Sequence, residues 1–317
     1  MIRAWLVDGG AAREAPADEV IARVLAGAGN GWIDFDCEDE ASARAVLEPL
    51  HIHPLVLEDM VSEINRPKVD NYGDYLYLVV HSARWEAERP MLREVDIVVG
   101  EHWLVTYHEG ETRSVAAAHT ALARRPDLLA HGPTPLLHFL LDVLVDNYLP
   151  IMDHVGEAID ALEESVFDPR GERIPEHAVH LKRGMAALRR IVGPERDTLL
   201  ALTRDEFKPI PADMRPYLRD VYDRLARVSD LLDSYRDEIA TLLELHVSVV
   251  SNRLNEIIKR LTVIATVGVP LTVVTSYYGM NLQIAAYKWP HGELYVLAVL
   301  AVTALLTYAV LRWKRWD

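Results

Sequence analysis

Two long runs of uncharged, mostly apolar residues constrain this chain more than any other feature. The first, Leu261 to Met280, reads LTVIATVGVPLTVVTSYYGM, and the second extends from Leu294 to Leu311. A helix needs about 20 apolar residues to cross the roughly 30 Å hydrocarbon core of a bilayer. We therefore expect two transmembrane helices rather than two buried helices of a soluble core.

Charges beside these runs predict the orientation in the membrane. Basic residues lie before the first run and after the second, while the connecting segment offers only Lys288 and His291 as cations. Because positive residues are retained on the cytoplasmic side, we expect a multi-pass protein of the cell (inner) membrane with both termini in the cytoplasm. The outer basic residues are Lys259, Arg260, Arg312, Lys314 and Arg315.

The rest of the chain is acidic. Residues 259–317 have a net charge of +4 and residues 1–258 a net charge of −19, so the whole chain carries −15. Such a body lacks the basic surface of a nonspecific nucleic-acid binder, so we expect no nucleic-acid partner. The single cysteine, Cys37, excludes an intramolecular disulfide and fits a reducing compartment.

Strand and helix patterns in the first third predict a mixed α/β domain. Short β-branched and aromatic segments predict strands at 2–7, 32–35, 75–81, 95–99 and 103–107. Helical patterns lie between them at 19–26, 39–47 and 54–60. From Leu136 onward the pattern is helical, with breaks expected near Asp168-Pro169, Gly193-Pro194 and residues 209–211.

One helix is expected to run from the acidic body into the first apolar run. Neither proline nor glycine occurs between Tyr217 and Val267, and apolar residues follow a three-four spacing from Leu218 to Val249. Such a seam has to be covered, either by flanking helices or by copies of the same helix. The seam comprises Leu218, Val221, Leu225, Val228, Leu232, Tyr235, Ile239, Leu242, His246 and Val249.

Two interpretations of this helix stay open on spacing alone: a coiled-coil stalk without a transport role, or the wall of a central pore. Continued through the membrane end, the spacing selects a face without an ionisable group, polar at its ends and apolar in its middle. Serine and threonine on this face fit a pore, although they also serve ordinary helix packing in membranes. The face comprises Asn255, Ile258, Thr262, Ala265, Val269, Thr272 and Ser276.

Several blocks of the sequence resemble the CorA-type family of magnesium channels. Tyr278-Gly279-Met280-Asn281, at the end of the first apolar run, resembles the family signature. The other blocks come in the same order as in the family: HPLVLEDM at 53–60, RPKVDNY at 66–72, YLRDVYDRL at 217–225, SNRLNEIIKRLTVIAT at 251–266, and a basic, aromatic ending.

The resemblance implies an α+β fold in a homopentameric funnel, in which each long stalk helix continues into the pore-lining span. Gly279, Met280 and Asn281 would form the selectivity filter at the outer mouth. By similarity, the pore is lined by Asn255, Ile258, Leu261, Val269, Thr272 and Ser276. The implied regions are a cytoplasmic α/β domain (1–135), a cytoplasmic helical region (136–208), the stalk (209–260), the pore helix (261–281), an external loop (282–293), the second span (294–312) and a basic cytoplasmic tail (313–317).

The resemblance also implies a function: uptake of Mg²⁺, with Co²⁺ or Ni²⁺ as further ions, driven by the membrane potential. Intracellular Mg²⁺ would close the channel by binding between subunits at Asp59 and Asp220, with Glu58 and Asp223 close by. Mg²⁺ is then both the transported and the regulatory ion, and no organic cofactor is expected. Amide and carbonyl oxygens suit an ion that keeps its waters, because they hydrogen-bond to its hydration shell.

Departures from the family pattern leave two alternatives. The external loop lacks an acidic stretch, and isoleucine, valine and serine stand at 258, 269 and 276, where the family often has methionine or glycine. A Zn²⁺ transporter of the same architecture is one alternative, and a membrane-anchored oligomeric sensor or interaction protein is the other. An enzyme is not expected, because the sequence has no HExxH, phosphate-binding glycine loop or nucleophile elbow.

Overall fold

A mixed seven-stranded sheet organises the first half of the chain. The computed structural model describes residues 1–36, 40–62, 65–86, 89–166, 174–204, 206–280 and 288–313. The strand order is β2-β1-β3-β7-β6-β5-β4, with β3 and β7 parallel and the other pairs antiparallel. The strands are β1 (Ile2–Asp8), β2 (Ala11–Glu14), β3 (Asn30–Asp36), β4 (Lys68–Asn71), β5 (Leu76–Glu86), β6 (Arg89–Val99) and β7 (Trp103–His108).

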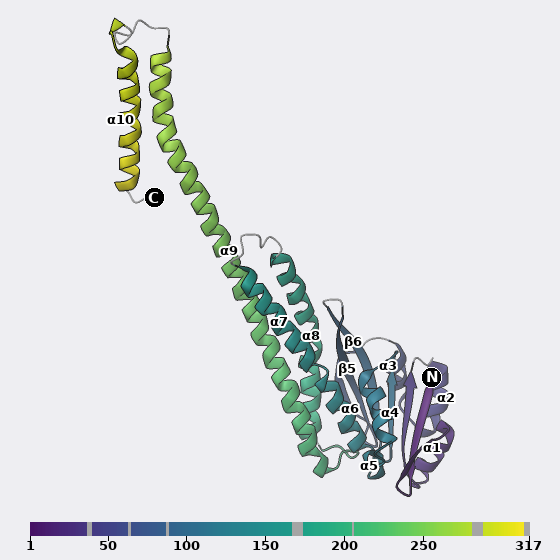
Figure 1. Cartoon of the computed structure of the whole chain (residues 1–317). Coiled ribbons are helices and arrows are strands. Elements are labelled where there is room, and N and C mark those ends of the chain that lie inside the picture. The colour runs from purple at the N-terminus through teal and green to yellow at the C-terminus, as the bar shows by residue number, and fades with distance from the viewer. Residues whose placement is uncertain are drawn as a thin grey trace. The chain divides into compact units, whose positions relative to one another are not determined.

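Helices cover both faces of this sheet (Figure 1). On one face, Ile33, Phe35 and Tyr107 belong to a core shared with α1 (Ala17–Leu25), α2 (Glu40–Leu47) and α3 (Pro54–Ser62). The other face packs against α5, α6 and α8. The helices that follow β7 are α4 (Arg113–Leu122), α5 (Asp127–Ala130), α6 (Thr134–Asp146), α7 (Leu149–Val166), α8 (Ile174–Arg204), α9 (Arg215–Gly279) and α10 (Gly292–Trp313), and short 3₁₀ turns lie at Glu48–Leu50 and Ala212–Met214.

The five predicted strands and three predicted early helices are confirmed, but two strands were missed. Both missed strands, β2 and β4, have four residues and form the two edges of the sheet. An edge strand is half solvated, so its sequence carries little of the apolar alternation that identifies a strand.

The predicted break at Gly193-Pro194 is wrong. Helix α8 continues through Pro194 to Arg204. Although an interior proline costs a helix about 3 kcal/mol, α8 buries side chains on both sides of it, including Val192 and Leu199, and that burial holds the helix together. The break near residues 209–211 is confirmed, and the one near Asp168-Pro169 lies outside the described residues.

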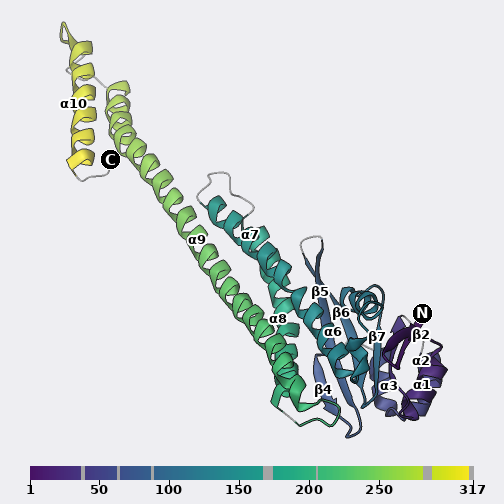
Figure 2. The ribbon, with the colours of Figure 1, turned by 60° about the horizontal axis from the view of Figure 1, so that its bottom comes forward.

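Helix α9 is a single helix of 65 residues, as the stretch without proline or glycine from Tyr217 to Val267 predicts, and it continues through Pro270 to Gly279. It belongs to both compact units of the chain, 1–243 and 244–317. In the first unit, flanking helices of the same chain cover its seam (Figure 2): Tyr235 contacts Gly156 of α7, and Arg189 of α8 pairs with Asp233. The buried seam residues are Leu218, Val221, Leu225, Val228, Leu232, Ile239 and Leu242.

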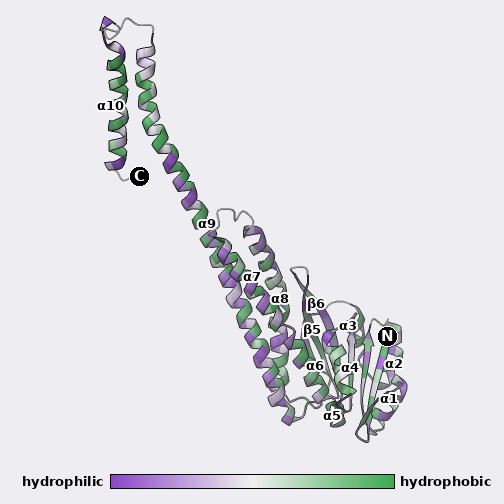
Figure 3. Ribbon diagram, viewed as in Figure 1, coloured by the Kyte–Doolittle hydropathy of each residue, from purple (hydrophilic) through white to green (hydrophobic). Residues whose placement is uncertain are grey.

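Within the described parts of the chain, three helical segments are long and apolar enough to cross a membrane. Thr134–Val166 is one of them, but half of its apolar window is buried within the protein, where α6 packs against the sheet. The other two windows, in Ala212–Gly279 and Gly292–Trp313, are 0% and 6% buried. Figure 3 shows α10 as mostly hydrophobic and the last part of α9 as alternating between hydrophobic and near-neutral residues. These are the two segments that the sequence predicts to span the membrane.

Candidate ion pathway and regulatory carboxylates

One face of α9 in the second unit is partly covered, and α10 lies alongside it in both views (Figures 1 and 2). The half-buried residues repeat every three or four positions: Val263, Val267, Leu271, Val274 and Tyr278. Helix α10 has a matching half-buried stripe, which includes Val296, Leu300, Thr303 and Thr307. Small and β-branched side chains on such stripes allow two helices to approach closely within a membrane.

The predicted pore face lies on the opposite side of α9 from this contact. Its six residues, given by the resemblance, are all exposed in the single chain, and Ile258, Leu261 and Val269 are 51%, 65% and 61% exposed. At 100° per residue, Val269 lies about 160° around the helix from the α10-facing Val267, and Ser276 lies about 180° from it. The uncovered face is therefore free to meet copies of the same helix.

Hydroxyl groups give this face its polarity. Thr272 Oγ1 donates to the Gly268 carbonyl oxygen at 2.9 Å, so its oxygen keeps lone pairs that can accept from water. Thr272 and Ser276 also line a shallow hollow on the helix surface. The other residues that line it are Val269, Val273, Tyr277 and Met280.

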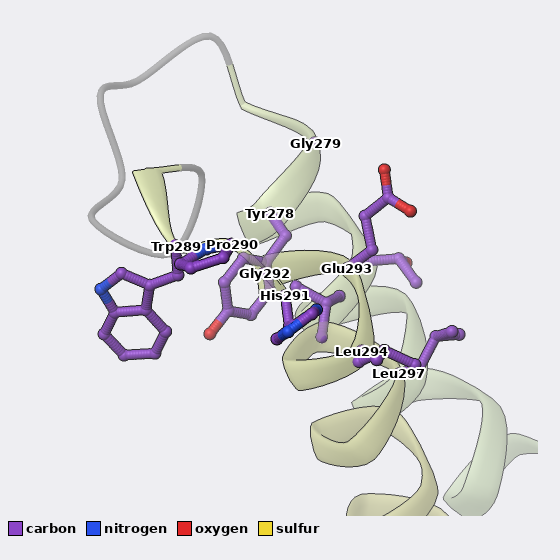
Figure 4. Close-up of a pocket in the computed structure, with 11 residues that line it drawn as sticks. Tyr278, Gly279, Trp289, Pro290, His291, Gly292, Glu293, Leu294 and Leu297 are labelled. Carbon is purple, nitrogen blue, oxygen red and sulfur yellow. The ribbon is translucent and has the colours of Figure 1, made fainter.

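The filter motif lies at the end of α9. Gly279 is the last helical residue, and Met280 donates its backbone N–H to the Tyr277 carbonyl oxygen at 3.4 Å and is 51% exposed. Asn281 lies outside the described residues. A pocket at this end is lined by Tyr278 and Gly279 of α9, by His291 just before α10, and by the first residues of α10, among them Glu293 (Figure 4).

The first predicted regulatory carboxylate, Asp59 on α3, already has a cation from its own chain. Lys68 Nζ lies 2.7 Å from Asp59 Oδ2 and 3.2 Å from Asp70 Oδ2. Burial lowers the pKa of Lys68, but the hydrogen bonds to Asp59 and Asp70 outweigh it and raise that pKa. The adjacent Glu58 is exposed.

Asp220, the second regulatory carboxylate, lies near the start of α9 and is also paired. Its side chain is 72% exposed, and Oδ2 lies 3.4 Å from Nε of Arg224, one helical turn later. The same guanidinium pairs with Asp142 and Asp146 on α6. Asp223 is exposed.

The structure does not bring Asp59 and Asp220 together within one chain: the ion pairs of each are made to other residues. Among the described residues, no group of three or more histidine, cysteine, aspartate or glutamate side chains could hold a metal ion. A regulatory site built from both carboxylates would therefore need a second chain.

Sequence reasoning missed two buried polar networks in the first compact unit, residues 1–243. In one, Asp34 accepts hydrogen bonds from Thr106 and from His119 Nε2, the latter at 2.8 Å. In the other, Glu195 and Tyr148 are fully buried beside the backbone of His81. Neither set has a recognisable spacing, because its members come from different strands and helices.

Known proteins resemble this chain over nearly its whole length. A family model described as CorA-like Mg²⁺ transporter protein matches residues 27–315. The cobalt/magnesium transport protein CorA of Thermotoga maritima is 31% identical over 84% of this chain and 77% of its own. The zinc transport protein ZntB of Pectobacterium atrosepticum is 23% identical, over 79% and 76%.

A solved structure shares the fold. The complete CorA magnesium transporter from Methanocaldococcus jannaschii matches with a TM-score of 0.86 and 17% identity, covering 100% of this chain and 99% of that one. At 17% identity, this match shows that the two chains share a fold and shows nothing about a shared function. It supports the arrangement of a mixed sheet domain joined to a long helix and a second, C-terminal helix.

Proposed function

Because this chain belongs to the CorA-like Mg²⁺ transporter family, whose members transport divalent cations and are not enzymes, we propose that it is a channel for Mg²⁺ uptake across the cell (inner) membrane. Co²⁺ and Ni²⁺ are further candidate ions. Both termini would lie in the cytoplasm, as the distribution of basic residues favours.

The observation that carries this proposal is the uncovered face of α9. Helix α10 accounts for one side of the span, and the opposite side, from Asn255 to Ser276, is exposed and free of ionisable groups. A homopentamer would bury this face around a central axis. In that arrangement Thr272 and Ser276 present oxygens to the water shell of an ion, and the apolar residues at 258, 261 and 269 form rings that gate by dewetting.

The chemistry of the filter suits a hydrated ion. Mg²⁺ gives up its waters reluctantly, so Gly279, Met280 and Asn281 would act through carbonyl and amide oxygens that accept hydrogen bonds from those waters. Neutral dipoles also release the ion more readily than a ring of carboxylates. The membrane potential would supply about 2.3 kcal/mol per charge per 100 mV, on two charges.

Intracellular Mg²⁺ would regulate the channel from the acidic body. In the pentamer, Asp59 of one subunit would face Asp220 of its neighbour, with Glu58 and Asp223 nearby. Carboxylates at such an interface repel until a divalent ion bridges them, so falling Mg²⁺ would loosen the ring and open the gate.

A flux assay tests the transport proposal. Full-length protein in liposomes should take up Mg²⁺ in response to an inside-negative potential, and Asn281→Ala should abolish uptake while the assembly keeps five times the mass of the 35.8 kDa chain. Uptake of no divalent ion would favour the membrane-anchored sensor instead.

Zn²⁺ is the second candidate ion, because the zinc transport protein ZntB is among the relatives. Uptake by the same liposomes, measured with Mg²⁺, Co²⁺, Ni²⁺ and Zn²⁺ in competition, distinguishes a Mg²⁺ channel from a Zn²⁺ transporter. Uptake of Zn²⁺ that an excess of Mg²⁺ does not reduce, and that follows an imposed pH gradient, would replace the magnesium proposal by proton-coupled zinc transport.

A further inference from the structure

We propose that Arg224 is a tethered cation that competes with cytosolic Mg²⁺ at Asp220, and thereby sets the Mg²⁺ concentration at which transport is inhibited. The inference rests on the proposed regulatory role of Asp220. It concerns a residue that binds no ion and acts by occupying the carboxylate that the ion needs.

The guanidinium of Arg224 lies among three carboxylates from two helices. Its terminal nitrogens pair with Asp142 and with Asp146 of α6, the latter at 2.5 Å. Its Nε lies 3.4 Å from Asp220 of α9. The Arg224 side chain is 18% exposed, so the group is well shielded from water.

The three contacts differ in strength. The two contacts with α6 are close and join the terminal nitrogens, whereas the Nε–H makes no hydrogen bond. Exposure of the carboxylates increases from 32% for Asp142 to 51% for Asp146 and 72% for Asp220. Asp220 is therefore the partner that can turn to another cation while Arg224 stays anchored to α6.

Charge gives the direction of the effect. One guanidinium among three carboxylates leaves a net charge of −2, and burial lowers the pKa of the neighbouring His138. Without Arg224 the cluster would carry −3, and Asp220 would have no competing cation. Mg²⁺ should then bind more tightly, by roughly 3–10-fold for partly exposed charges a few ångströms apart.

The experiment measures inhibition by Mg²⁺ on the cytoplasmic side of full-length protein in liposomes. A second readout, independent of transport, is Mg²⁺-dependent protection from chymotrypsin. Arg224→Gln should lower the midpoint of both curves by about 3–10-fold. Arg224→Lys keeps the charge and should stay near the wild-type midpoint.

A matched control separates competition from loss of a helix tether. Arg189 of α8 pairs with Asp233 of α9 at 2.7 Å, so Arg189→Gln also removes an ion pair that holds α9 but leaves Asp220 untouched. This variant should keep the wild-type midpoint. Asp142→Asn frees Arg224 to pair more fully with Asp220 and should raise the midpoint, which tests the idea even if Arg224→Gln does not fold.

Several outcomes would overturn the inference: an unchanged or raised midpoint in Arg224→Gln, an equal shift in Arg189→Gln, or an unchanged or lowered midpoint in Asp142→Asn. Asp220→Asn distinguishes this failure from that of the proposed regulation. If Asp220→Asn abolishes inhibition and Arg224→Gln changes nothing, only the role of Arg224 fails. If wild-type protein is not inhibited by Mg²⁺, the regulation and the inference fail together.

Discussion

Glu195 illustrates how single residues in the acidic body depend on partners far away in the sequence. Tyr148 Oη lies 2.9 Å from both Glu195 Oε2 and the His81 carbonyl oxygen, and the His81 N–H lies 3.3 Å from Glu195 Oε1. A tyrosine hydroxyl has one proton, so all three contacts are satisfied when protonated Glu195 donates to Tyr148 and Tyr148 donates to His81. Burial, only partly offset by these hydrogen bonds, raises the pKa of Glu195 to about 8.

Glu195→Gln should therefore stabilise the protein at high pH. A raised native pKa means that the stabilisation from the protonated group is complete below the pKa of the unfolded chain and is lost as pH rises toward 8. Glutamine keeps a donor at this position without the cost of ionisation. We expect a gain of about 1–3 kcal/mol at pH 8, shrinking toward pH 5, in thermal unfolding of the full-length protein. Glu157→Gln on the exposed face of α7 should change little; an equal gain there would contradict the assignment.

Asp34 shows the opposite shift. Burial opposes its ionisation, but His108, whose Nε2 lies 3.4 Å from Asp34 Oδ1, and the hydrogen bonds from His119 and Thr106 outweigh this and lower its pKa to about 2. The Trp5 indole N–H donates to His119 Nδ1 at 2.9 Å, so the His119 Nε2–H is the group that donates to Asp34. The carboxylate is thus the acceptor at the centre of a buried network.

Asp34→Asn should destabilise the protein by about 2–4 kcal/mol at pH 7, because the new amide group would face donors. A lowered native pKa gives stability that is present above pH 4 and lost as pH falls toward 2. The wild type should accordingly lose stability over that range, and the variant should lose less. Acid unfolding followed by circular dichroism measures both, with exposed Asp18→Asn as the control that should match wild type.

At the scale of the element, α9 carries two different faces in its membrane part. The side toward α10 has half-buried Val263, Val267 and Val274, whereas the other side is exposed. Thr272 and Thr275 form a matched pair, since each hydroxyl donates to the carbonyl four residues earlier, at 2.9 and 3.0 Å. Only Thr272 lies on the predicted pore face, and Thr275 lines the pocket beside α10.

Thr272→Val should thus reduce Mg²⁺ flux while Thr275→Val leaves it near wild type. Each change removes one hydroxyl and its hydrogen bonding to the preceding turn of the helix backbone at nearly constant volume, so their effects on the helix are similar. Loss of a water-accepting oxygen worth about 1 kcal/mol would slow flux by roughly fivefold. Equal effects of the two substitutions on liposome flux would argue against the proposed pore face.

For the whole molecule, the proposed sensor depends on an interface between subunits. Asp59 and Asp220 are each paired within their own chain and lie on α3 and α9. Replacing both by asparagine should make conduction insensitive to cytosolic Mg²⁺, because no carboxylate pair would remain to be bridged. Asp230→Asn, an exposed carboxylate on the same helix, should leave inhibition intact. Unchanged inhibition in the double variant would refute the sensor assignment.

The sequence alone was sufficient for the features that depend on neighbouring residues. The two spans, the long α9 helix, its seam and five strands all follow from apolar length or periodicity, which one segment contains in full. The CorA-type resemblance rested on contiguous blocks for the same reason. The candidate site could be predicted only as far as those blocks reach: its residues were named, while their positions around a shared axis stay a prediction.

Tertiary structure alone decided what depends on distant partners. The edge strands β2 and β4 pair because β1 and β5 present open edges, and α8 passes through Pro194 because the fold buries its flanks. The raised pKa of Glu195 and the ion pairs between Arg224 and α6 could not be predicted from the sequence either. The contacts responsible join residues 47 to 114 positions apart. Hydrogen bonds and ion pairs act over a few ångströms, and only the folded chain brings such residues within that range.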